Sequence, residues 1–509
     1  MYGLENKNQL YIDQMYVKRH LAAIEADQFN PAAFYNDFLP VMEDRERKYK
    51  QYTTKHNAID DRKPPENSTI IKAFNQIHNS FYNLIVDQKA GYLFGNPITY
   101  TIEGDSADND QAKDWLDDFL RSENMTIKNT ITGTQQAACG TSFMLFDIES
   151  DGQETRPTLK VIDSWFGYVL DERKAAVYIE DDYVTNIGFM RYLHLITPEK
   201  ITTYRSVMTG VNVKSDFNKF EEKANLLKVI TLAEFKNNAD CQSDFETVED
   251  LIDSYDRTVS ATQDEIEEFR WAYLLIFGTR IDEDEAKKIL GGETGVLNIR
   301  DPAGSANFLT KDLPVEFINT YLKMITENIF KFSKSIDVND PAFAGGSESG
   351  EARKWKLIAL EFKANMAEVF YKAGLNNLFG AIAAYMNTHD SKDVDAHDIR
   401  ATFTRTLPVD LSYLAGVISQ LGDHLTEEKL LSMLPIVEDP EAEAEAKMEE
   451  RQRKAKIQAT MYEDPYTPDA GGDDDEPTVN NLLDKEKKAA PGPDDEKGKS
   501  NANSDKKAT

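Results

Sequence analysis

Apolar residues recur with helical spacing in two long stretches that flank a short strand-rich segment. The first stripe, with intervals of three, four and seven residues, predicts a helix over 243–271. Ser243 and Glu246 match a capping box at its start. The second stripe predicts a helix over 313–335 that carries a proline in its first turn, where the missing N–H costs nothing. The stretch 272–312 between them is rich in strand-forming residues, Gly and Pro, so the sequence predicts a helical hairpin with a small β-containing tip.

The N-terminal half combines helices with strands. Residues 9–56 show helical spacing, and a second helical stretch starts at a capping residue, Ser68, and ends at 95–97, Gly-Asn-Pro. From residue 98 to about 235 short strand-like runs follow one another. Hairpin turns rather than helices join these runs, which indicates antiparallel pairing and an α+β fold.

The C-terminal half begins with a break at 336–350, which is rich in Gly and Pro. A third long helix is predicted from there to about Asn387, followed by one strand-like run at 399–408 and a further helical pair. From about 462 onward, Asp, Glu, Lys, Pro and Gly dominate and apolar residues nearly vanish. Such a segment cannot bury enough surface to offset its ordering entropy, so we expect a disordered acidic tail.

Composition and charge narrow the class of protein. The 509 residues are too many for one compact core, so we expect several domains or an elongated subunit. The two cysteines form no disulfide framework, and the chain shows neither a signal peptide nor an apolar run of spanning length, so we expect a soluble intracellular product with no membrane contact. The formal net charge of −31 is the opposite of the basic face that tight nucleic-acid binders carry. This acidity either keeps the chain soluble or provides a surface that lets DNA pass without gripping it.

Motifs for catalysis are missing from the sequence. The seven histidines are scattered, and no HExxH, GxSxG, Walker A or GxGxxG pattern occurs. The cluster of His and Asp at 389–398 has neither EF-hand nor zinc spacing, which favours a solvated connection. We therefore expect no catalytic residue, no cofactor and no metal.

Two further features allow two interpretations each. The stretch 344–350, AGGSESG, is either a phosphate cradle or a flexible connector, and Arg353, Lys354 and Lys356 follow it directly. The helix at 243–271 carries an acidic outer face that is either solvated or the lining of a central hole. These acidic residues are Glu249, Asp250, Asp253, Asp256, Asp264, Glu265, Glu267 and Glu268.

An ordered set of short motifs resembles the portal proteins of tailed bacteriophages, in particular those of siphoviruses with Gram-positive hosts. Each motif alone is short, but together they run in order over nearly the whole folded chain. The motifs are NLIVDQKAGYLFGNPITY at 83–100, EFKNNADCQSDFETVEDLIDSYDRTVS at 234–260, FLTKDLP at 308–314, GGSESGEARKWKL at 345–357, FTRTLPVD at 403–410 and LLSMLPIVEDPEAE at 430–443.

This resemblance implies an elongated portal-type α+β subunit with an α/β wing, long stem helices, a small β-containing clip and a helical crown. The implied divisions are an N-terminal helical segment at 1–39, the first part of the wing at 40–242, a stem helix at 243–271, the clip at 272–312, a second stem helix at 313–335, a tunnel loop at 336–350, a wing helix at 351–374, the crown at 375–461 and the disordered tail at 462–509.

The resemblance also implies functional residues. The loop that narrows the DNA channel is implied to contain Asn339, Asp340, Phe343, Ala344, Gly345, Gly346 and Ser347. Cations near this loop that line the channel are Lys331, Lys334, Arg353 and Lys354. The clip surface that docks the terminase is implied to include Asp282, Glu283 and Asp284.

The implied function is a ring, dodecameric in this family, at one capsid vertex, through which double-stranded DNA passes without sequence recognition. Implied partners are further copies of the chain, the terminase large subunit, the major capsid and scaffolding proteins and a head-completion adaptor. The implied location is the virion, after assembly in the host cytoplasm. Two alternatives remain: a minor head protein or packaging nuclease, and an adaptor that binds through the acidic tail.

Overall fold

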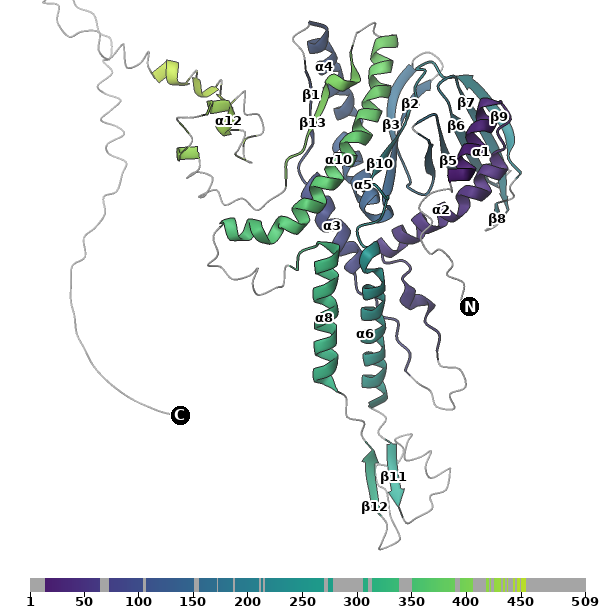
Figure 1. Ribbon diagram of the computed structural model, residues 1–509, viewed down its shortest axis with the longest axis vertical. Helices are drawn as coiled ribbons and strands as arrows, with labels where there is room; N and C mark the ends of the chain where they lie inside the picture. The colour runs from purple at the N-terminus through teal and green to yellow at the C-terminus, as the bar shows by residue number, and fades with distance from the viewer. Residues whose placement is uncertain are drawn as a thin grey trace, which may run out of the picture. The chain divides into compact units, whose positions relative to one another are not determined.

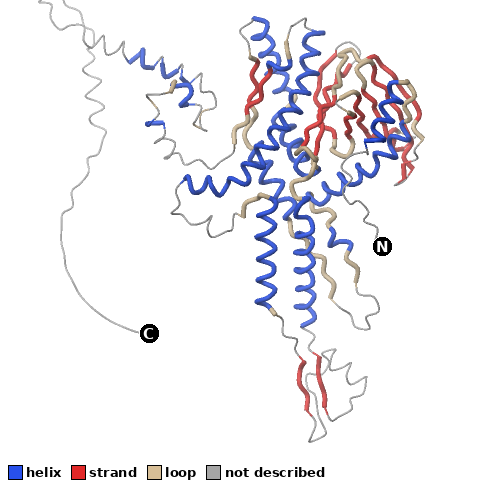
Figure 2. Tube along the Cα trace, in the orientation of Figure 1, coloured by secondary structure: helices blue, strands red, loops and turns tan. Residues whose placement is uncertain are grey.

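Figures 1 and 2 show the computed structural model of the chain. It falls into two compact units, residues 1–410 and 411–509, which are described separately. The residues that the structure describes are 14–64, 73–103, 107–150, 155–171, 173–185, 188–209, 212–213, 216–269, 273–277, 305–309, 314–337, 350–389, 394–405 and short stretches between 418 and 454.

Two N-terminal helices cover one sheet of the first unit. Helix α1 spans Gln14–Glu25 and α2 spans Pro31–Tyr52. Helix α2 begins where it does because the Asn30 side chain accepts a hydrogen bond from the backbone N–H of Ala33 and proline occupies the first helical position. Its residue Phe34 packs on Tyr168 of the sheet, with ring centroids 6.0 Å apart.

The strands pair in an antiparallel manner throughout the sheets that the structure describes, which confirms the predicted α+β class. One sheet has the order β4-β5-β6-β7-β8, with β9 also paired to β7, and another has the order β10-β2-β3. The strands of the larger sheet are β4 Gly167–Leu170, β5 Ala175–Val184, β6 Gly188–Ile196, β7 Lys200–Thr209, β8 Asn212–Val213 and β9 Asn218–Ala224. Those of the smaller sheet are β2 Thr141–Ser150, β3 Thr155–Ile162 and β10 Leu232–Lys236.

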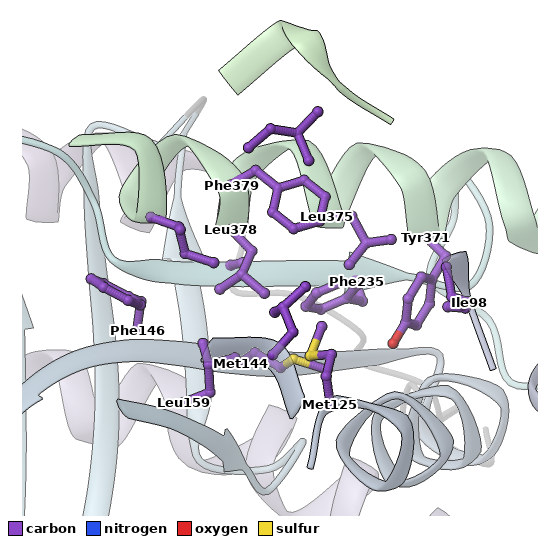
Figure 3. Packing of buried hydrophobic residues seen from close by; sticks show 14 of the residues in the cluster. Ile98, Met125, Met144, Phe146, Leu159, Phe235, Tyr371, Leu375, Leu378 and Phe379 are labelled. Carbon is purple, nitrogen blue, oxygen red and sulfur yellow. The ribbon is translucent and has the colours of Figure 1, made fainter. Parts of the chain in front are cut away.

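The largest core lies between the smaller sheet and the 40-residue helix α10, Gly350–His389 (Figure 3). Tyr371 and Phe379 of α10 are fully buried there, and the rings of Tyr371 and Phe235 lie 4.7 Å apart. The other elements of this core are α3 Phe81–Phe94, α4 Ala107–Ser122, α5 Met125–Cys139 and the strand pair β1 Thr99–Ile102 with β13 Ile399–Thr402. The division that the resemblance implies at 374/375 falls inside the continuous helix α10.

The predicted helical hairpin is present in the structure. Helix α6 spans Glu249–Phe269 and α8 spans Val315–Ser333. Ile252 of α6 and Ile325 and Ile329 of α8 are buried in one shared cluster, which explains the apolar stripe in each sequence. Between them in the chain, β11 Tyr273–Phe277 pairs with β12 Ser305–Leu309.

Three local expectations differ from the structure. Residues 73–80 are not helical, and α3 begins only at Phe81, so the helix predicted from Ser68 is wrong over this part. Helices α4 and α5 occupy positions where the sequence indicated only strands. Half of the capping box forms, because Glu246 accepts from the backbone N–H of Ser243 at 3.1 Å, but a short 3-10 turn at Glu246–Val248 precedes α6.

Two more 3-10 turns, Ala58–Asp61 and Ala396–Asp398, complete the first unit as described. In the second unit, the described residues include the short helix α12, Glu427–Leu431. No helix among the described residues is both long and apolar enough to cross a bilayer. The tail from 462 onward lies outside the described residues.

Candidate functional site at the root of the helical hairpin

An extended segment, residues 73–79, runs along α6 and is held by a regular ladder of hydrogen bonds. The backbone N–H and the side-chain amide of Asn79 both donate to Asp256, at 3.0 and 2.7 Å, and the same two groups of Asn75 donate to Asp264, at 2.7 and 2.8 Å. Between them the N–H of Ile77 donates to Ser260 at 2.9 Å. The ladder is regular because two extended residues and one helical turn both advance the chain by about 6 Å.

The ladder changes the interpretation of the acidic face of α6. Asp256 and Asp264 are buried acceptors, Asp253 accepts from the hydroxyl of Tyr82, and Glu249 accepts from Gln51 and Arg47. The expectation of one acidic face that is either solvated or channel-lining is therefore wrong for these four residues, because each accepts hydrogen bonds from other parts of the same chain. Asp250, in contrast, is exposed.

Burial makes Asp256 an unusual carboxyl group. Its side chain is buried, and the loss of hydration raises its pKa to about 6, although the hydrogen bonds from Asn79 act in the opposite direction. Its second carboxylate oxygen is buried without a hydrogen-bond partner. The ladder therefore orders the segment 73–79, but it leaves the carboxylate of Asp256 buried with one oxygen that has no hydrogen-bond partner.

A buried charge cluster joins α3, the approach to α6, and α10. Asp244 is 3 % exposed, and its carboxylate lies 2.9 Å from the ammonium of Lys89 and 3.3 Å from that of Lys363. Asn237 donates to Asp244 at 2.8 Å and accepts from Lys89. Three elements that are distant in the sequence are thus fixed to one carboxylate.

The ionisation of this cluster is set by one anion shared between two cations. Burial alone would raise the pKa of Asp244, but the two lysines outweigh it and hold that pKa below its usual value. Burial lowers the pKa of both lysines, that of Lys363 to about 8, because one carboxylate cannot compensate two desolvated ammonium groups. The cluster depends on Asp244 more than on either lysine.

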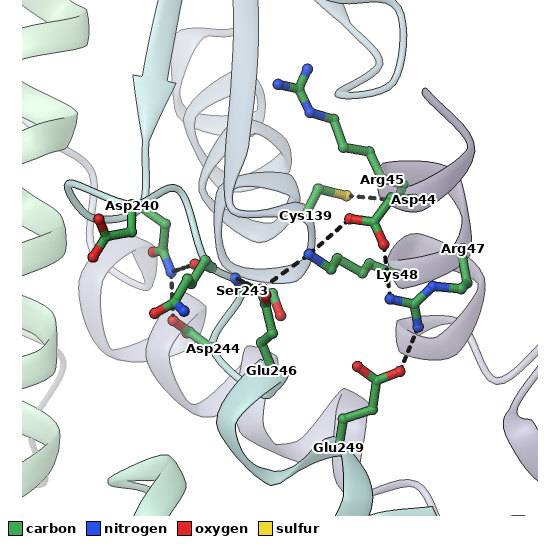
Figure 4. A network of polar contacts seen from close by, with 12 residues as sticks. Asp44, Arg45, Arg47, Lys48, Cys139, Asp240, Ser243, Asp244, Glu246 and Glu249 are labelled. Carbon is green, nitrogen blue, oxygen red and sulfur yellow. Dashed lines mark hydrogen bonds and ion pairs between the residues drawn. The ribbon is translucent and has the colours of Figure 1, made fainter. Parts of the chain in front are cut away.

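A second charge cluster anchors α2 to the start of the hairpin (Figure 4). The fully buried ammonium of Lys48 lies 3.0 Å from both Asp44 and Glu246. The preceding residue, Arg47, pairs with Asp44 at 2.9 Å and also with Glu249 of α6. The first turn of the hairpin is therefore bound to α2 by charge-assisted hydrogen bonds.

The exit from α8 is fixed at three successive points. Lys334 ends the helix in the left-handed conformation, with φ of 56°. The ammonium of Lys363 donates to the carbonyl of Ser333 at 3.1 Å. The side-chain amide of Gln88 forms two hydrogen bonds with the backbone of Ile336: it donates to the carbonyl at 2.6 Å and accepts from the N–H at 2.8 Å. The stretch that leaves α8 toward residue 338 thus starts from a fixed position.

The structure places some of the predicted site residues. Lys331 is exposed in the last turn of α8, three residues before Lys334, and Arg353 and Lys354 lie in the first turns of α10. The loop residues Asn339, Asp340, Phe343, Ala344, Gly345, Gly346 and Ser347, and the clip residues Asp282, Glu283 and Asp284, lie outside the described residues.

Sequence reasoning missed the residues that hold the site together, namely Gln88, Lys89, Asp244 and Lys363. A signal for two of them existed, because Lys89 and Lys363 each stand in an otherwise apolar helical stripe. Within the part of the chain that the structure describes, no three His, Cys, Asp or Glu side chains are grouped so that they could hold a metal ion. That includes Asp395, His397 and Asp398.

Comparisons with known proteins agree on one family. Residues 42–457 match the family described as "Phage portal protein, SPP1 Gp6-like". The portal protein of Bacillus phage SPP1 is 25% identical over 435 residues, which cover 79% of this chain and 80% of that protein. The portal protein of Clostridium phage phiCD119 is 24% identical over 422 residues, which cover 77% and 88%.

Among solved structures, a chain from the neck of an empty GTA particle, computed with C6 symmetry, aligns with a TM-score of 0.40 and 11% identity, covering 70% of this chain and 90% of that chain. The family match extends over most of the sequence and includes the hairpin and its root. The chain therefore belongs to the SPP1-type family of phage portal proteins, and is a structural component of the phage head rather than an enzyme.

Proposed function

We propose that twelve copies of this chain close into a ring at one capsid vertex, and that double-stranded DNA enters and leaves the head through its centre. The observation that supports this most directly is the family match, together with a helical hairpin that is fixed at its root. A head-to-tail contact repeated between identical subunits closes into a ring when its rotation divides a full turn. A stiff hairpin repeated in this way would form a continuous wall.

DNA transport requires a wall that guides DNA without holding it. Each phosphate contact strengthens binding and slows sliding, so a channel with few exposed cations suits transport. The exposed Lys331, at the end of α8, is proposed to touch the phosphate backbone without reading sequence, together with Lys334, Arg353 and Lys354.

The loop at 336–350 is proposed to narrow the channel. Its first residue, Ile336, is fixed by Gln88, and the end of α8 before it is fixed by Lys363 at Ser333, so movement of the loop would not disturb the hairpin. We expect deletion of Phe343 through Ser347 to leave particle assembly intact and to abolish DNA packaging. The measurement is packaged, nuclease-resistant DNA per assembled head. Normal packaging by the deletion variant would contradict a channel role for this loop.

Docking of other proteins is proposed for the segment 272–312, between the two hairpin helices. We expect charge reversal at Asp282, Glu283 or Asp284 to weaken stimulation of the terminase ATPase by the ring. A terminase response equal to that of the unaltered ring would remove this assignment. The major capsid and scaffolding proteins and the head-completion adaptor are further proposed partners at the vertex.

Deleting the acidic tail, residues 462–509, tests between the portal function and the alternative of an adaptor that binds through this tail. A chain that acted only through its tail would lose its partners when residues 462–509 are deleted. We expect the truncated protein to assemble into the same particles as the full chain, as measured by electron microscopy. The family match also favours the portal function over a packaging nuclease.

A further inference from the structure

Two side faces of the hairpin carry charges with the same spacing and opposite signs. On α6, Asp250 and Arg257 are exposed and seven residues apart, and on α8, Glu316 and Lys323 are exposed and seven residues apart. Seven residues return a helical side chain to nearly the same face, about 10 Å further along the axis. Because α6 and α8 are antiparallel, Arg257 and Glu316 lie toward the strand end of the hairpin, whereas Asp250 and Lys323 lie toward its root.

The heights of these charges along the hairpin can be compared through one contact. The hydroxyls of Ser254 and Tyr321 lie 3.2 Å apart and place these residues at the same level. At about 1.5 Å per residue, Glu316 and Lys323 each lie about 3 Å further from the root than Arg257 and Asp250, respectively. One small axial shift between two hairpins therefore aligns both pairs at once.

The surfaces beside these charged positions are also complementary in shape. On α8, Phe317 and Met324 are 70% and 48% exposed and again seven residues apart, which makes an apolar ridge. On α6 there is a shallow groove of about 310 Å³. It is lined by Ser254, Arg257, Thr258, Ala261, Thr262 and Glu265. Small side chains leave room for a ridge from another helix.

Within the chain, helices α6 and α8 meet mainly through buried residues such as Ile252 and Ile325, and the groove touches α8 at Ser254, which contacts Tyr321. The side of α6 that carries Ser260 is covered by the segment 73–79. In the described part of the chain, Asp250 and Arg257 form no ion pair with Glu316 or Lys323, and Lys323 contacts only the exposed Glu327, at 3.9 Å. An exposed intrahelical pair of this kind is weak and is easily exchanged.

We propose, on the premise of the ring put forward above, that this face of α8 packs against the groove face of α6 in the next copy. Glu316 pairs with Arg257 of the neighbouring copy, Lys323 pairs with its Asp250, and Phe317 enters the groove. The two faces differ, so the contact is head-to-tail, as ring closure requires. The two charge pairs favour one register between copies, because a shift by seven residues brings like charges together and smaller shifts leave the charges unpaired.

Cross-linking tests the proposed register directly. The variant Arg257→Cys with Glu316→Cys, treated with a short bismaleimide, is expected to give a ladder of covalent multimers on a denaturing gel. The native Cys139 and Cys241 are buried and should not react. The matched control joins Arg257→Cys with Val315→Cys, an exposed position about 100° around α8 from Glu316, and is expected to cross-link about tenfold less. Equal ladders in both variants, or only internal cross-links, would overturn the proposal.

Charge reversal provides an independent test on the same surface. Arg257→Glu alone and Glu316→Arg alone are each expected to reduce the yield of annular particles about tenfold, because like charges then face one another. Mixing the two single variants should restore the yield, since alternating copies again place opposite charges across every contact. If the mixture gives as few annular particles as either single variant alone, the assigned charge pair is wrong.

The outcomes separate this inference from the proposed function. If the unaltered chain forms annular particles but reversal and cross-linking show no preference, only the α6–α8 contact is wrong. If the unaltered chain forms no annular particles, the ring itself fails, and the contact with it. Far-UV circular dichroism of each variant checks that these exposed substitutions leave the subunit folded.

Discussion

Replacing Asp244 by asparagine tests whether the hairpin root is held by its buried charges. The substitution keeps the size of the side chain and one carbonyl oxygen, which can still accept from Asn237. It removes the one carboxylate that pairs with both Lys89 and Lys363 among the described residues, and these lysine side chains are 0% and 10% exposed. Removing one partner of a buried ion pair leaves an uncompensated charge and costs about 3–5 kcal/mol. We expect the Asp244→Asn variant to lose unfolding free energy in this range.

The assay is urea unfolding followed by far-UV circular dichroism, with the first transition assigned to the unit that contains α6, α8 and α10. Asp240→Asn is the matched control, because Asp240 is an exposed carboxylate in the same segment, and it should change the unfolding free energy by less than about 0.5 kcal/mol. Adding Lys89→Met to Asp244→Asn should recover part of the loss, since one buried ammonium is then removed. Equal stability of the Asp244 and Asp240 variants would refute the reasoning.

Two further predictions concern single buried positions. The pKa of Asp256 is about 6 in the folded state and 3.8 in the unfolded state, so the folded state binds the proton more tightly. The free energy of unfolding should therefore fall by about 2–3 kcal/mol as the pH rises from 4 to 7. Asp256→Asn should abolish this dependence in thermal unfolding measured at a series of pH values. Gly140 has φ of +84°, and an added Cβ would lie 1.8 Å from the carbonyl oxygen of Cys241. Gly140→Ala should therefore lower the unfolding free energy by more than about 2 kcal/mol in urea titrations, whereas Gly91→Ala, with open space and helical backbone, should raise it by about 0.5 kcal/mol.

The hairpin could be predicted from the sequence because each of its helices buries one continuous stripe. Ile252 on α6 and Ile325 on α8 recur with their neighbours at helical spacing, and the burial of both in one cluster is the physical origin of that spacing. The long helix α10 was predicted for the same reason, although its continuation across 374/375 shows that apolar spacing does not mark a division within a helix.

The errors come from interactions that local patterns do not contain. Phe74 and Ile77 have helical spacing with the residues of α3, yet they lie in an extended segment. The backbone N–H of Ile77 donates to Ser260, and those of its neighbours Asn75 and Asn79 donate to acidic residues of α6. Helix α5 is rich in β-branched residues such as Thr126 and Ile131, which favour strands, and tertiary packing overrides that preference.

The charge clusters could not be predicted because their members are far apart in the sequence. Lys89, Asp244 and Lys363 come from three elements, and only the packing of α3 and α10 on the approach to α6 brings them together. The net charge of −31 suggested an acidic outer face, but it does not show which carboxylates are exposed. The same total includes the buried Asp256 and the exposed Asp250.

Electron microscopy of the purified full-length chain, combined with native mass measurement, tests the ring most directly. The account predicts annular particles with a central hole and a mass close to twelve times 57.7 kDa. A folded chain that stays at the mass of a single subunit, even when mixed with capsid and scaffolding proteins, would contradict it.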